Sequence, residues 1–455
     1  MTYEEATRYL LTLGKELSAP RQPASVAQAQ KFGLGNIRVL AEALGQPQRA
    51  YPCAHIAGTN GKGSTAAMLE SILRAAGLHT GLYTSPHLER INERIRLDGE
   101  SVSDADFAAS FARLAAAIES GIASGALAAH PTYFECLTAM AFDCFAQHAV
   151  DFGVFEVGMG GRLDATNLVA PEVGVITQID FDHENYLGHS IEEIAGEKAG
   201  IIKPGAWVVS AAERPEARGV IARRCAEMDA RLVEIDTAYR IEEVRGESGC
   251  YRAVVSGAHS SRKIALELPL PGRFQVRNAA TAVAAARLLA ERGFPVSDED
   301  IARGIASVRW PGRLERLAER PAVYLDGTHN PAGARELVRF WEENFAGRRI
   351  FLVYGAVRDK AVDEIAGLLF PRATRVLLTA PQQPRAISAP LLAEMAGHLA
   401  SDFEIIADPA QALARALELA QPDDAVFVTG SLYLVGDLRA SWNRRLLPVP
   451  ASPPA

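Results

Sequence analysis

The sequence lacks the features that mark several large classes of protein. Its formal net charge is −8, so no basic surplus indicates a nucleic-acid partner. No stretch approaches the roughly 20 consecutive apolar residues that a membrane-spanning helix needs. The first residues have neither the basic start nor the apolar core of a secretory signal. We therefore expect a cytoplasmic protein with no nucleic acid and no membrane among its partners.

Cysteine is also scarce. The chain has five cysteines, an odd number with no C-x-x-C pair among them. Reduced and mostly buried thiols are the usual form of such cysteines in a cytoplasmic protein. The pattern gives no support to a disulfide framework or a zinc site.

Short apolar runs alternate with helical patterns along most of the chain. A Pro-Gly pair at residues 311–312 breaks a helical pattern and predicts a boundary between two domains. On either side of it, strands that alternate with helices predict mostly parallel sheets covered on both faces. Residues 232–270 are richer in strand pattern and predict a smaller antiparallel sheet. The expected strands of the parallel sheets are residues 53–57, 79–84, 152–157, 173–178, 323–325, 350–354, 375–379 and 425–428.

The sequence GTNGKGST at residues 58–65 follows an expected strand and overlaps an expected helix at residues 64–76. Glycines let backbone N–H groups turn toward an anion, and a helix N-terminus adds partial positive charge there. Lys62 can reach the terminal phosphates of a nucleotide, and the Ser64 hydroxyl can bind Mg²⁺. The spacing differs from the common G-x-x-x-x-G-K-[ST] form, because Gly63 separates the lysine from the serine. A tight glycine turn without a ligand is the alternative.

Polar groups follow the strand ends that we expect beside this loop. Glu156 ends an apolar strand, and ligands of open parallel sheets bind at the carboxyl ends of strands. A carboxylate there can hold Mg²⁺ next to nucleotide phosphates, although an exposed strand-end acid would look the same in sequence. His183 follows another apolar strand and could ligate a second metal ion. Lys198 is either a solvated helix lysine or, if CO₂ converts it to a carbamate, an acidic metal ligand.

These residues are part of a longer series of runs that resembles one family, the folylpolyglutamate synthase and dihydrofolate synthase branch of the Mur ligase superfamily. The resemblance implies a P-loop ATPase-like parallel-sheet domain at residues 1–309 and a smaller C-terminal Rossmann-like α/β domain at residues 310–445. Residues 446–455 would form a flexible tail. Ten runs occur in the order of that family and cover most of the chain. They are residues 32–37, 58–65, 84–88, 132–135, 156–167, 182–204, 277–278, 310–313, 326–331 and 430–436.

The resemblance also implies a reaction. ATP phosphorylates a carboxylate of a pterin substrate, and the amine of L-glutamate then attacks the acyl phosphate, so that an amide forms and phosphate leaves. Dihydropteroate, reduced folates or both would be the acceptors, in folate biosynthesis and polyglutamation, and we predict both activities. The implied cofactors are ATP, two Mg²⁺ ions and a carbamylated Lys198, and the implied state is a monomer.

The roles of individual residues follow from the same resemblance. Where the family usually has a second acid after the lysine at position 360, this chain has Ala361, and we therefore give Lys360 little weight. The expected catalytic residues are Lys62, His183, Lys198, Asp326 and His329. The expected nucleotide contacts are Gly58, Thr59, Asn60, Gly61, Lys62, Gly63, Ser64, Thr65, Asn278, Arg313 and Asp326. The expected metal ligands are Ser64, Ser85, Glu156, His183 and Lys198. The expected pterin contacts are Arg90, Phe134 and Asp164.

The sequence leaves two other functions open. A Mur ligase of cell-wall synthesis, which adds an amino acid to a UDP-linked precursor, would share the ATP site and the metals. The runs at residues 132–135 and 160–167 favour the folate branch over it. A P-loop switch protein that turns nucleotide over slowly is the second alternative. The strand-end Glu156, together with a second α/β domain that carries His329, favours catalysis.

Overall fold

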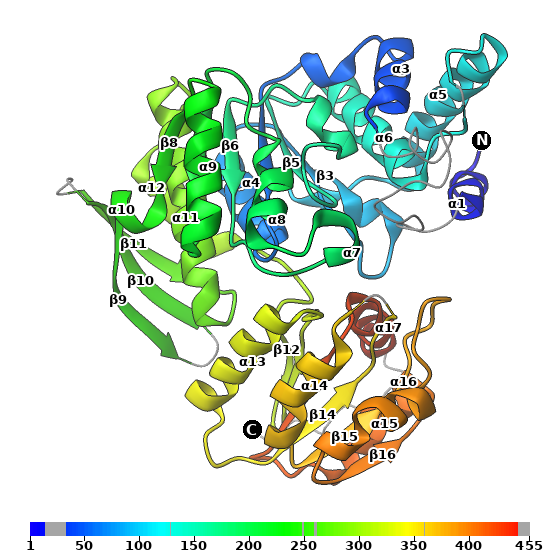
Figure 1. The fold of residues 1–455 in the computed structure, drawn as a ribbon, viewed down its shortest axis with the longest axis vertical. Coiled ribbons are helices and arrows are strands. Elements are labelled where there is room, and N and C mark those ends of the chain that lie inside the picture. Colours follow the sequence, from blue (N-terminus) through cyan, green and yellow to red (C-terminus); the bar gives the residue numbers. More distant parts are fainter. Residues whose placement is uncertain (14–32, 128, 248–249, 259–261, 359, 445–455) are drawn as a thin grey trace.

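Two α/β parts of unequal size make up the molecule (Figure 1). The N-terminal part holds an eight-stranded and a three-stranded sheet, and the C-terminal part holds a six-stranded sheet. The last helix of the first part ends at Ser307 and the first strand of the second begins at Glu315, so the predicted boundary lies between them. The expected tail at residues 446–455 lies outside the described residues. The computed structural model describes residues 1–13, 33–127, 129–247, 250–258, 262–358 and 360–444.

The eight-stranded sheet has the strand order β4-β3-β2-β5-β1-β6-β7-β8. Pairing is parallel from β2 across to β8, whereas β3 and β4 run antiparallel at one edge. Because β1 lies between β5 and β6, the carboxyl ends of these three strands meet at one edge of the sheet. The strands are β1 (Cys53–Ala57), β2 (Thr80–Tyr83), β3 (Ile95–Leu97), β4 (Glu100–Ser101), β5 (Phe152–Glu156), β6 (Val173–Ile176), β7 (Trp207–Ser210) and β8 (Arg231–Glu234).

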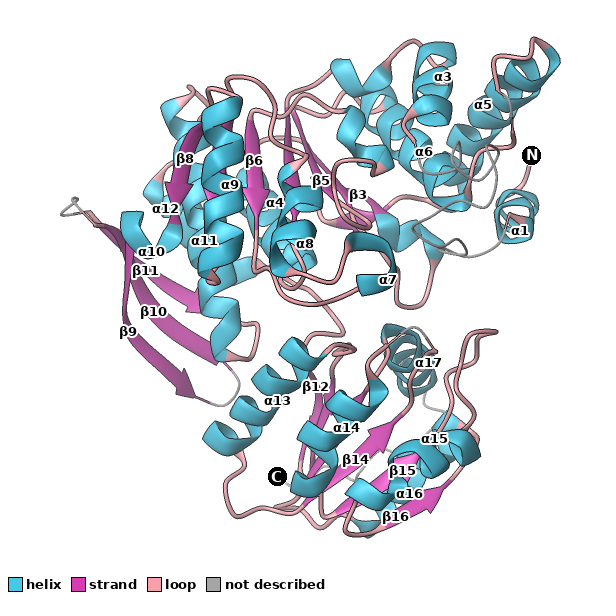
Figure 2. Ribbon diagram, viewed as in Figure 1, coloured by secondary structure: helices cyan, strands magenta, loops and turns pink. Residues whose placement is uncertain are grey.

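Helices cover both faces of this sheet (Figure 2). Residues of β1 alternate between the two cores: Ala54 and Ile56 pack with α4, α11 and α12, while Cys53 and Ala57 face α6 and α8. A strand buried on both faces is the expected behaviour of a central parallel strand. The helices of this part are α1 (Tyr3–Thr12), α3 (Gly35–Ala43), α4 (Lys62–Ala75), α5 (Asp104–Ala123), α6 (Tyr133–Gln147), α7 (Glu184–Leu187), α8 (Ile191–Ala199), α9 (Pro215–Glu227), α10 (Ile235–Ala238), α11 (Arg273–Glu291) and α12 (Asp298–Ser307).

The predicted smaller antiparallel sheet is confirmed. It comprises β9 (Tyr239–Glu247), β10 (Cys250–Gly257) and β11 (Lys263–Leu268), and it flanks α11 on the left of Figure 1. Alternate residues of β11 are buried, and its Leu266 packs in the same core as α4 and α11. This period of two is the pattern of a sheet with one buried face.

The C-terminal part is a second parallel sheet with helices on both faces. Its strand order is β12-β13-β17-β14-β15-β16, and only the edge strand β12 is antiparallel to its neighbour. Helices α13 to α15 pack in one core and α16 and α17 in the other. The elements are β12 (Glu315–Glu319), β13 (Ala322–Leu325), α13 (Pro331–Asn344), β14 (Ile350–Tyr354), α14 (Val362–Leu369), β15 (Arg375–Leu378), α15 (Ala389–Ala396), β16 (Phe403–Ile405), α16 (Pro409–Leu419), β17 (Ala425–Thr429) and α17 (Leu432–Asn443).

The structure also bears on the expectations about membrane-spanning helices and cysteines. No helix in the described ranges is both long and apolar enough to cross a membrane. All five cysteines are free; Cys250 is exposed and the other four are buried, as expected for structural thiols.

Candidate active site

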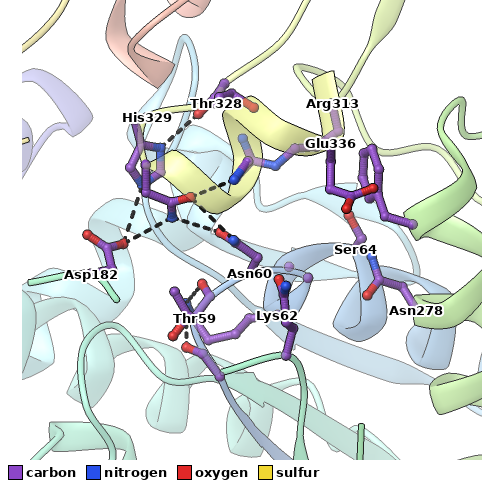
Figure 3. Close-up of a pocket in the computed structure, with 18 of the residues that line it drawn as sticks. Thr59, Asn60, Lys62, Ser64, Asp182, Asn278, Arg313, Thr328, His329 and Glu336 are labelled. Carbon is purple, nitrogen blue, oxygen red and sulfur yellow. Dashed lines mark hydrogen bonds and ion pairs between the residues drawn. The ribbon is translucent and has the colours of Figure 1, made fainter. Parts of the chain in front are cut away.

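A cleft of about 410 Å³ lies between the two parts and is lined by residues of both. The N-terminal part contributes the loops after β1, β2, β5 and β6 and the start of α11. The C-terminal part contributes the loop after β13 and α13 along most of its length, from Gly333 to Glu343. In Figure 3, Arg313 and His329 lie above Thr59, Asn60 and Lys62. The cleft is therefore at the sheet edge where parallel α/β proteins bind ligands.

The glycine-rich loop at residues 58–65, called the phosphate loop below, lines one side of the cleft with residues 58–64. Gly58 has a φ of +150°, and a Cβ there would lie 1.8 Å from Thr177 Oγ1. Gly61 has a φ of +87°, and its Cβ would lie 2.4 Å from Asn278 Oδ1. Glycine is required at both positions, and the tight turn starts α4 at Lys62, earlier than predicted. No side chain caps this helix N-terminus, so its dipole and first N–H groups are available to an anion.

Two lysines converge on a single carbonyl of this loop. Lys62 Nζ donates to the carbonyls of Gly58 and Thr59 at 3.1 Å each, and Lys198 Nζ donates to the Gly58 carbonyl at 2.8 Å. Lys198 is 4% exposed, so the alternative of a solvated helix lysine is wrong. Burial, together with the charge of Lys62, lowers the pKa of Lys198 to about 7. Burial and the neighbouring charge thus favour the neutral amine, which is the form that reacts with CO₂.

Glu156 ends β5, directly beside the loop strand β1, as predicted. Its carboxylate accepts the backbone N–H of Ser85 at 3.1 Å. Burial raises the pKa of Glu156, and the charge of Lys62 opposes that shift. Ser64 Oγ, at the start of α4, accepts a hydrogen bond from Gln275 Nε2 at 3.2 Å. Ser64, Ser85 and Glu156 all line the cleft, so a carboxylate and two hydroxyls are available there to a cation.

Asp182 connects the two walls of the cleft. Its carboxylate lies 2.9 Å from Lys360 Nζ and 3.9 Å from His329 Nε2, both in the C-terminal part. Burial alone would raise the pKa of Asp182, but the charge of Lys360 holds it well below its usual range. The neighbouring His183 has a φ of +50° and turns the chain into α7. Burial lowers the pKa of His183 to about 4, and its Nδ1 has no hydrogen-bond partner in the described part of the chain.

The C-terminal wall is built around Asp326 and His329. Asp326 accepts the backbone N–H groups of Leu314 at 2.9 Å and Thr328 at 3.0 Å, which fixes the loop after β13. His329 Nδ1 bonds to the Gly327 carbonyl at 2.7 Å, so this nitrogen carries the proton and Nε2 faces the opposite wall. Burial, followed by nearby positive charge, lowers the pKa of His329 to about 3. The ring is therefore neutral at physiological pH.

Amide side chains connect the loop to its surroundings. Asn60 and Asn330 exchange hydrogen bonds of 2.8 and 3.3 Å across the cleft. Asn278 Nδ2 donates to Gln275 Oε1 at 2.9 Å, and Asn278 and Arg313 both line the cleft. The predicted nucleotide contacts from the two parts thus face one space.

Three of the predicted site residues lie behind the cleft wall. Thr65 is fully buried in the first turns of α4. Asp164 is buried and accepts the backbone N–H groups of Met159 and Thr166, so it shapes the loop after β5. Phe134 packs against the same loop, since a Cβ at Gly158 would lie 2.5 Å from its ring.

Arg90 lies away from this cleft. Its guanidinium pairs with Asp104 at 2.7 Å and lies 5.3 Å from the Tyr3 ring centroid. It lines a separate pocket that also contains Glu89 and Arg439. The structure does not bring Arg90 together with the other predicted site residues.

The Asp182–Lys360 ion pair was not predicted as part of the site. Asp182 lies a few residues after an apolar strand, next to His183, which was predicted on that signal. Lys360 has no comparable signal, because its partner lies in the other part of the molecule. Its side chain is nevertheless only 8% exposed and pairs with Asp182.

Comparisons with known proteins identify the family. A family model for the Mur ligase middle domain matches residues 56–286, and one for the Mur ligase glutamate ligase domain matches residues 312–432. The dihydrofolate synthase/folylpolyglutamate synthase of Bacillus subtilis (strain 168) is 37% identical over 422 residues, covering 90% of this chain and 94% of the relative. The chain belongs to the folylpolyglutamate synthase and dihydrofolate synthase family. As predicted, this family member is an ADP-forming ligase.

Solved structures of this folylpolyglutamate synthase family have the same fold. Mycobacterium tuberculosis folylpolyglutamate synthase complexed with ADP matches with a TM-score of 0.87 at 33% identity, covering 97% of this chain and 98% of that one. The E. coli FolC structure in complex with DHPP and ADP matches with a TM-score of 0.83 at 33% identity, with the same coverage of 97% and 98%. These matches confirm the predicted α/β fold.

Proposed function

We propose that this ligase uses ATP to join L-glutamate to a pterin carboxylate, with dihydropteroate and tetrahydrofolate as acceptors. The observation that carries the proposal is the single cleft in which the phosphate loop, Glu156 and Lys198 face Arg313 and His329. The names of its relatives combine both activities, and one solved relative holds DHPP and ADP. The reaction is a phosphoryl transfer followed by an acyl transfer, for which positioning and charge stabilisation are the main requirements.

The phosphate loop and its helix form the proposed ATP site. Lys62 and the N–H groups at the start of α4 bind the β- and γ-phosphates. Asn278 and Arg313 contact the rest of the nucleotide from opposite walls. Asp326 fixes the loop that carries His329, and His329 presents a neutral Nε2 to the cleft.

The proposal includes two Mg²⁺ ions in the cleft. No group of three His, Cys, Asp or Glu side chains within the described ranges could hold a metal by itself. Mg²⁺ does not need such a cage, because it commonly binds through one or two protein ligands, waters and substrate phosphates. Ser64, Ser85 and Glu156 fit a first ion, and the unpartnered Nδ1 of His183 with a carbamylated Lys198 fits a second. Bound there, the ions would reduce the repulsion between ATP and the substrate carboxylate.

The chain's own residues close the cleft over the reactants. Lys360 bonds to Asp182, and Asn330 bonds to Asn60, so both contacts join the C-terminal wall to the loops after β1 and β6. Closure of this kind excludes water, which would otherwise hydrolyse an acyl phosphate. The same contacts hold the glutamate-ligase part over the nucleotide site.

The pterin is proposed to bind beside the loop after β5. Phe134 packs on this loop and Asp164 holds its backbone, so both can shape a site next to Glu156. Arg90, the third predicted pterin contact, lies on the separate pocket and has no geometric support.

A cytoplasmic monomer completes the proposal, and light scattering on a sizing column tests the oligomeric state.

The decisive test is phosphate release by purified protein with ATP, Mg²⁺ and one acceptor at a time. We expect release only when L-glutamate and either dihydropteroate or tetrahydrofolate are both present, and loss of release with EDTA. Nucleotide turnover without any acceptor would contradict the ligase reaction. If tetrahydrofolate supports phosphate release but dihydropteroate does not, the enzyme would carry out polyglutamation only. Release with a UDP-linked cell-wall precursor instead of a pterin would support the other Mur ligase function.

A further inference from the structure

Three of the family-like runs meet at one residue, Leu88. Leu88 ends the run at residues 84–88, which follows β2. The run at 310–313 lies in the linker between α12 and β12, where a Cβ at Gly312 would lie 2.9 Å from the Leu88 side chain, and the run at 430–436 leads into α17. Within the run at residues 430–436, Leu432 alone lines the cleft. The cleft therefore does not explain why position 436 is a glycine.

Gly436, in the first turns of α17, presses on the backbone of Leu88. A Cβ at position 436 would lie 2.1 Å from the Leu88 carbonyl oxygen and 2.8 Å from its carbonyl carbon. The third nearest atom is also from Leu88, at 3.3 Å, so the crowding comes from the N-terminal part. Glycine weakens a helix interior relative to alanine. Its presence in α17 is therefore explained by the close approach of the two parts.

Charged side chains hold the same contact. Arg439 lies 2.9 Å from a carboxylate oxygen of Glu315 and pairs with Glu89, which follows Leu88 directly. Asn443 donates to the same Glu89 at 3.3 Å. The side chains of Arg439, Glu89 and Glu315 are 25%, 21% and 21% exposed, so water screens these pairs only in part. Helix α17 is thus tied to the loop after β2 by two residues that follow Gly436, Arg439 and Asn443.

This loop leads directly to the proposed metal ligands. Ser85, three residues before Leu88, donates its N–H to Glu156, and it lines the cleft. The N–H of Leu88 is held from its own side by Glu93 at 2.8 Å. A displacement of Leu88 is therefore transmitted along a short, tethered segment to Ser85.

We propose that Gly436 is a positioning residue of the ligase. Its missing side chain allows α17 to contact the Leu88 carbonyl, and this contact sets both the closed position of the C-terminal part and the place of Ser85 beside Glu156. A side chain at position 436 keeps the two parts from reaching that arrangement.

The test compares Gly436→Ala with a matched control, Gly367→Ala, in which the exposed glycine of α14 has no atom near its Cβ position. We expect kcat of Gly436→Ala to fall at least about 10-fold, with little change in KM for ATP, because the phosphate loop is untouched. Trypsin should also cleave the linker faster, at the exposed Arg309. The control should match the unmodified chain in both readouts. A Gly436→Ala protein with kcat and linker cleavage like those of the control would overturn the proposal.

Arg439 provides a second test that leaves the backbone contact unchanged. In Arg439→Met, we expect faster cleavage at Arg309 and a lower kcat, and Arg439→Lys should recover part of each. If Gly436→Ala does not fold, Arg439→Met becomes the test of the proposal. An Arg439→Met protein with the same kcat and the same cleavage rate as the unmodified chain would then overturn it. The cleavage readout needs no substrate, so it is independent of which pterin the enzyme uses.

Discussion

The two walls of the cleft hold their charged groups by different means. In the N-terminal wall, Lys62 and Lys198 donate to the Gly58 carbonyl, and Glu156 accepts a nearby backbone N–H. In the C-terminal wall, Lys360 reaches across the cleft to Asp182. The second wall also holds Asp326 and His329 through its own backbone, but unlike the first wall it is completed by a charged group that bonds to the opposite part.

This difference implies two kinds of defect. A change in the N-terminal wall removes a group that binds the reactants in any arrangement of the two parts. A change in the C-terminal wall loosens their closure, and a residue that restores the cross-cleft contact should restore function. Substitutions in each wall can test whether the distinction holds.

The largest effect is expected from Lys62→Met, in the phosphate loop. Loss of the ammonium removes the positive charge next to the proposed β- and γ-phosphates, and kcat/KM should fall by about 10³-fold or more. Lys263→Met is the control, since Lys263 is exposed on β11 and pairs with Glu242. Steady-state phosphate release measures both. If the activity of Lys62→Met is within tenfold of that of the control, the proposed role of Lys62 in binding the phosphates is contradicted.

Lys198→Ala should be nearly as damaging, by about 10²-fold or more, because it removes the proposed carbamate ligand. Short carboxylic acids added to the assay should restore part of its activity by supplying a carboxylate in the space of the lost side chain. The same acids should have no effect on Lys62→Met. Normal activity of Lys198→Ala would contradict the carbamate hypothesis. If activity is lost and the acids do not restore it, the role of Lys198 would be the hydrogen bond to the Gly58 carbonyl.

The same difference between the walls explains what the sequence could predict. Glu156 and His183 follow apolar strands, and the loop glycines have a recognisable spacing, so local signals indicated most of the N-terminal wall. Lys360 and Gly436 act on residues far away in the chain, Asp182 and Leu88, and no local pattern marks such a contact. Their roles depend on how the two parts pack, which is a property of the tertiary structure.

The parallel sheets were predictable for a related reason. Every strand of the two large sheets that we expected is present within a residue or two of its predicted ends, because buried parallel strands have continuous apolar runs. The start of α4 was less predictable, since it depends on the positive φ of Gly61. The expectation for Arg90 was also misleading, because a family resemblance at a position just beyond the run at 84–88 does not show which side of the loop faces the cleft.

The C-terminal wall is tested by Lys360→Met and Lys360→Arg. Removal of the ammonium leaves the buried Asp182 without its main partner and weakens closure, so kcat should fall by about 10- to 100-fold. Arginine can span the same gap and should restore most of the rate. The melting temperature of Lys360→Met should fall as well, because the buried Asp182 is left unpaired, and Lys360→Arg should recover most of that loss. Equal loss in both variants would mean that the C-terminal wall depends on the lysine itself, as the N-terminal wall does.

The smallest effect on activity, and a clear effect on stability, is expected from His55. This histidine lies on β1 beneath the phosphate loop, and its Nε2 bonds to Thr166 Oγ1 at 2.8 Å. Thr166 donates in turn to Asp164, so Nε2 must be the donor to Thr166, and the buried Nδ1 has no partner in the described residues. Burial, with a further contribution from Lys203, lowers the pKa of His55 to about 3. The organisation of the N-terminal wall therefore depends on a histidine that stays neutral.

The sign of the pH effect follows from this depressed pKa. An unfolded histidine titrates near pH 6.5, so between about pH 6.5 and pH 3 the unfolded chain binds a proton that the folded chain does not. The contribution of His55 is complete above pH 6.5 and should decline by up to about 1.4 kcal/mol per pH unit as the pH falls. Urea unfolding at pH 7.5 and pH 5 should therefore show a loss of stability that is about 2 kcal/mol smaller in His55→Gln than in the unmodified chain. His398→Gln, which changes an exposed histidine of the C-terminal part, should leave the pH dependence unchanged. If both variants keep the full pH dependence of the unfolding free energy, the stability of the core around β1 does not depend on the protonation state of His55.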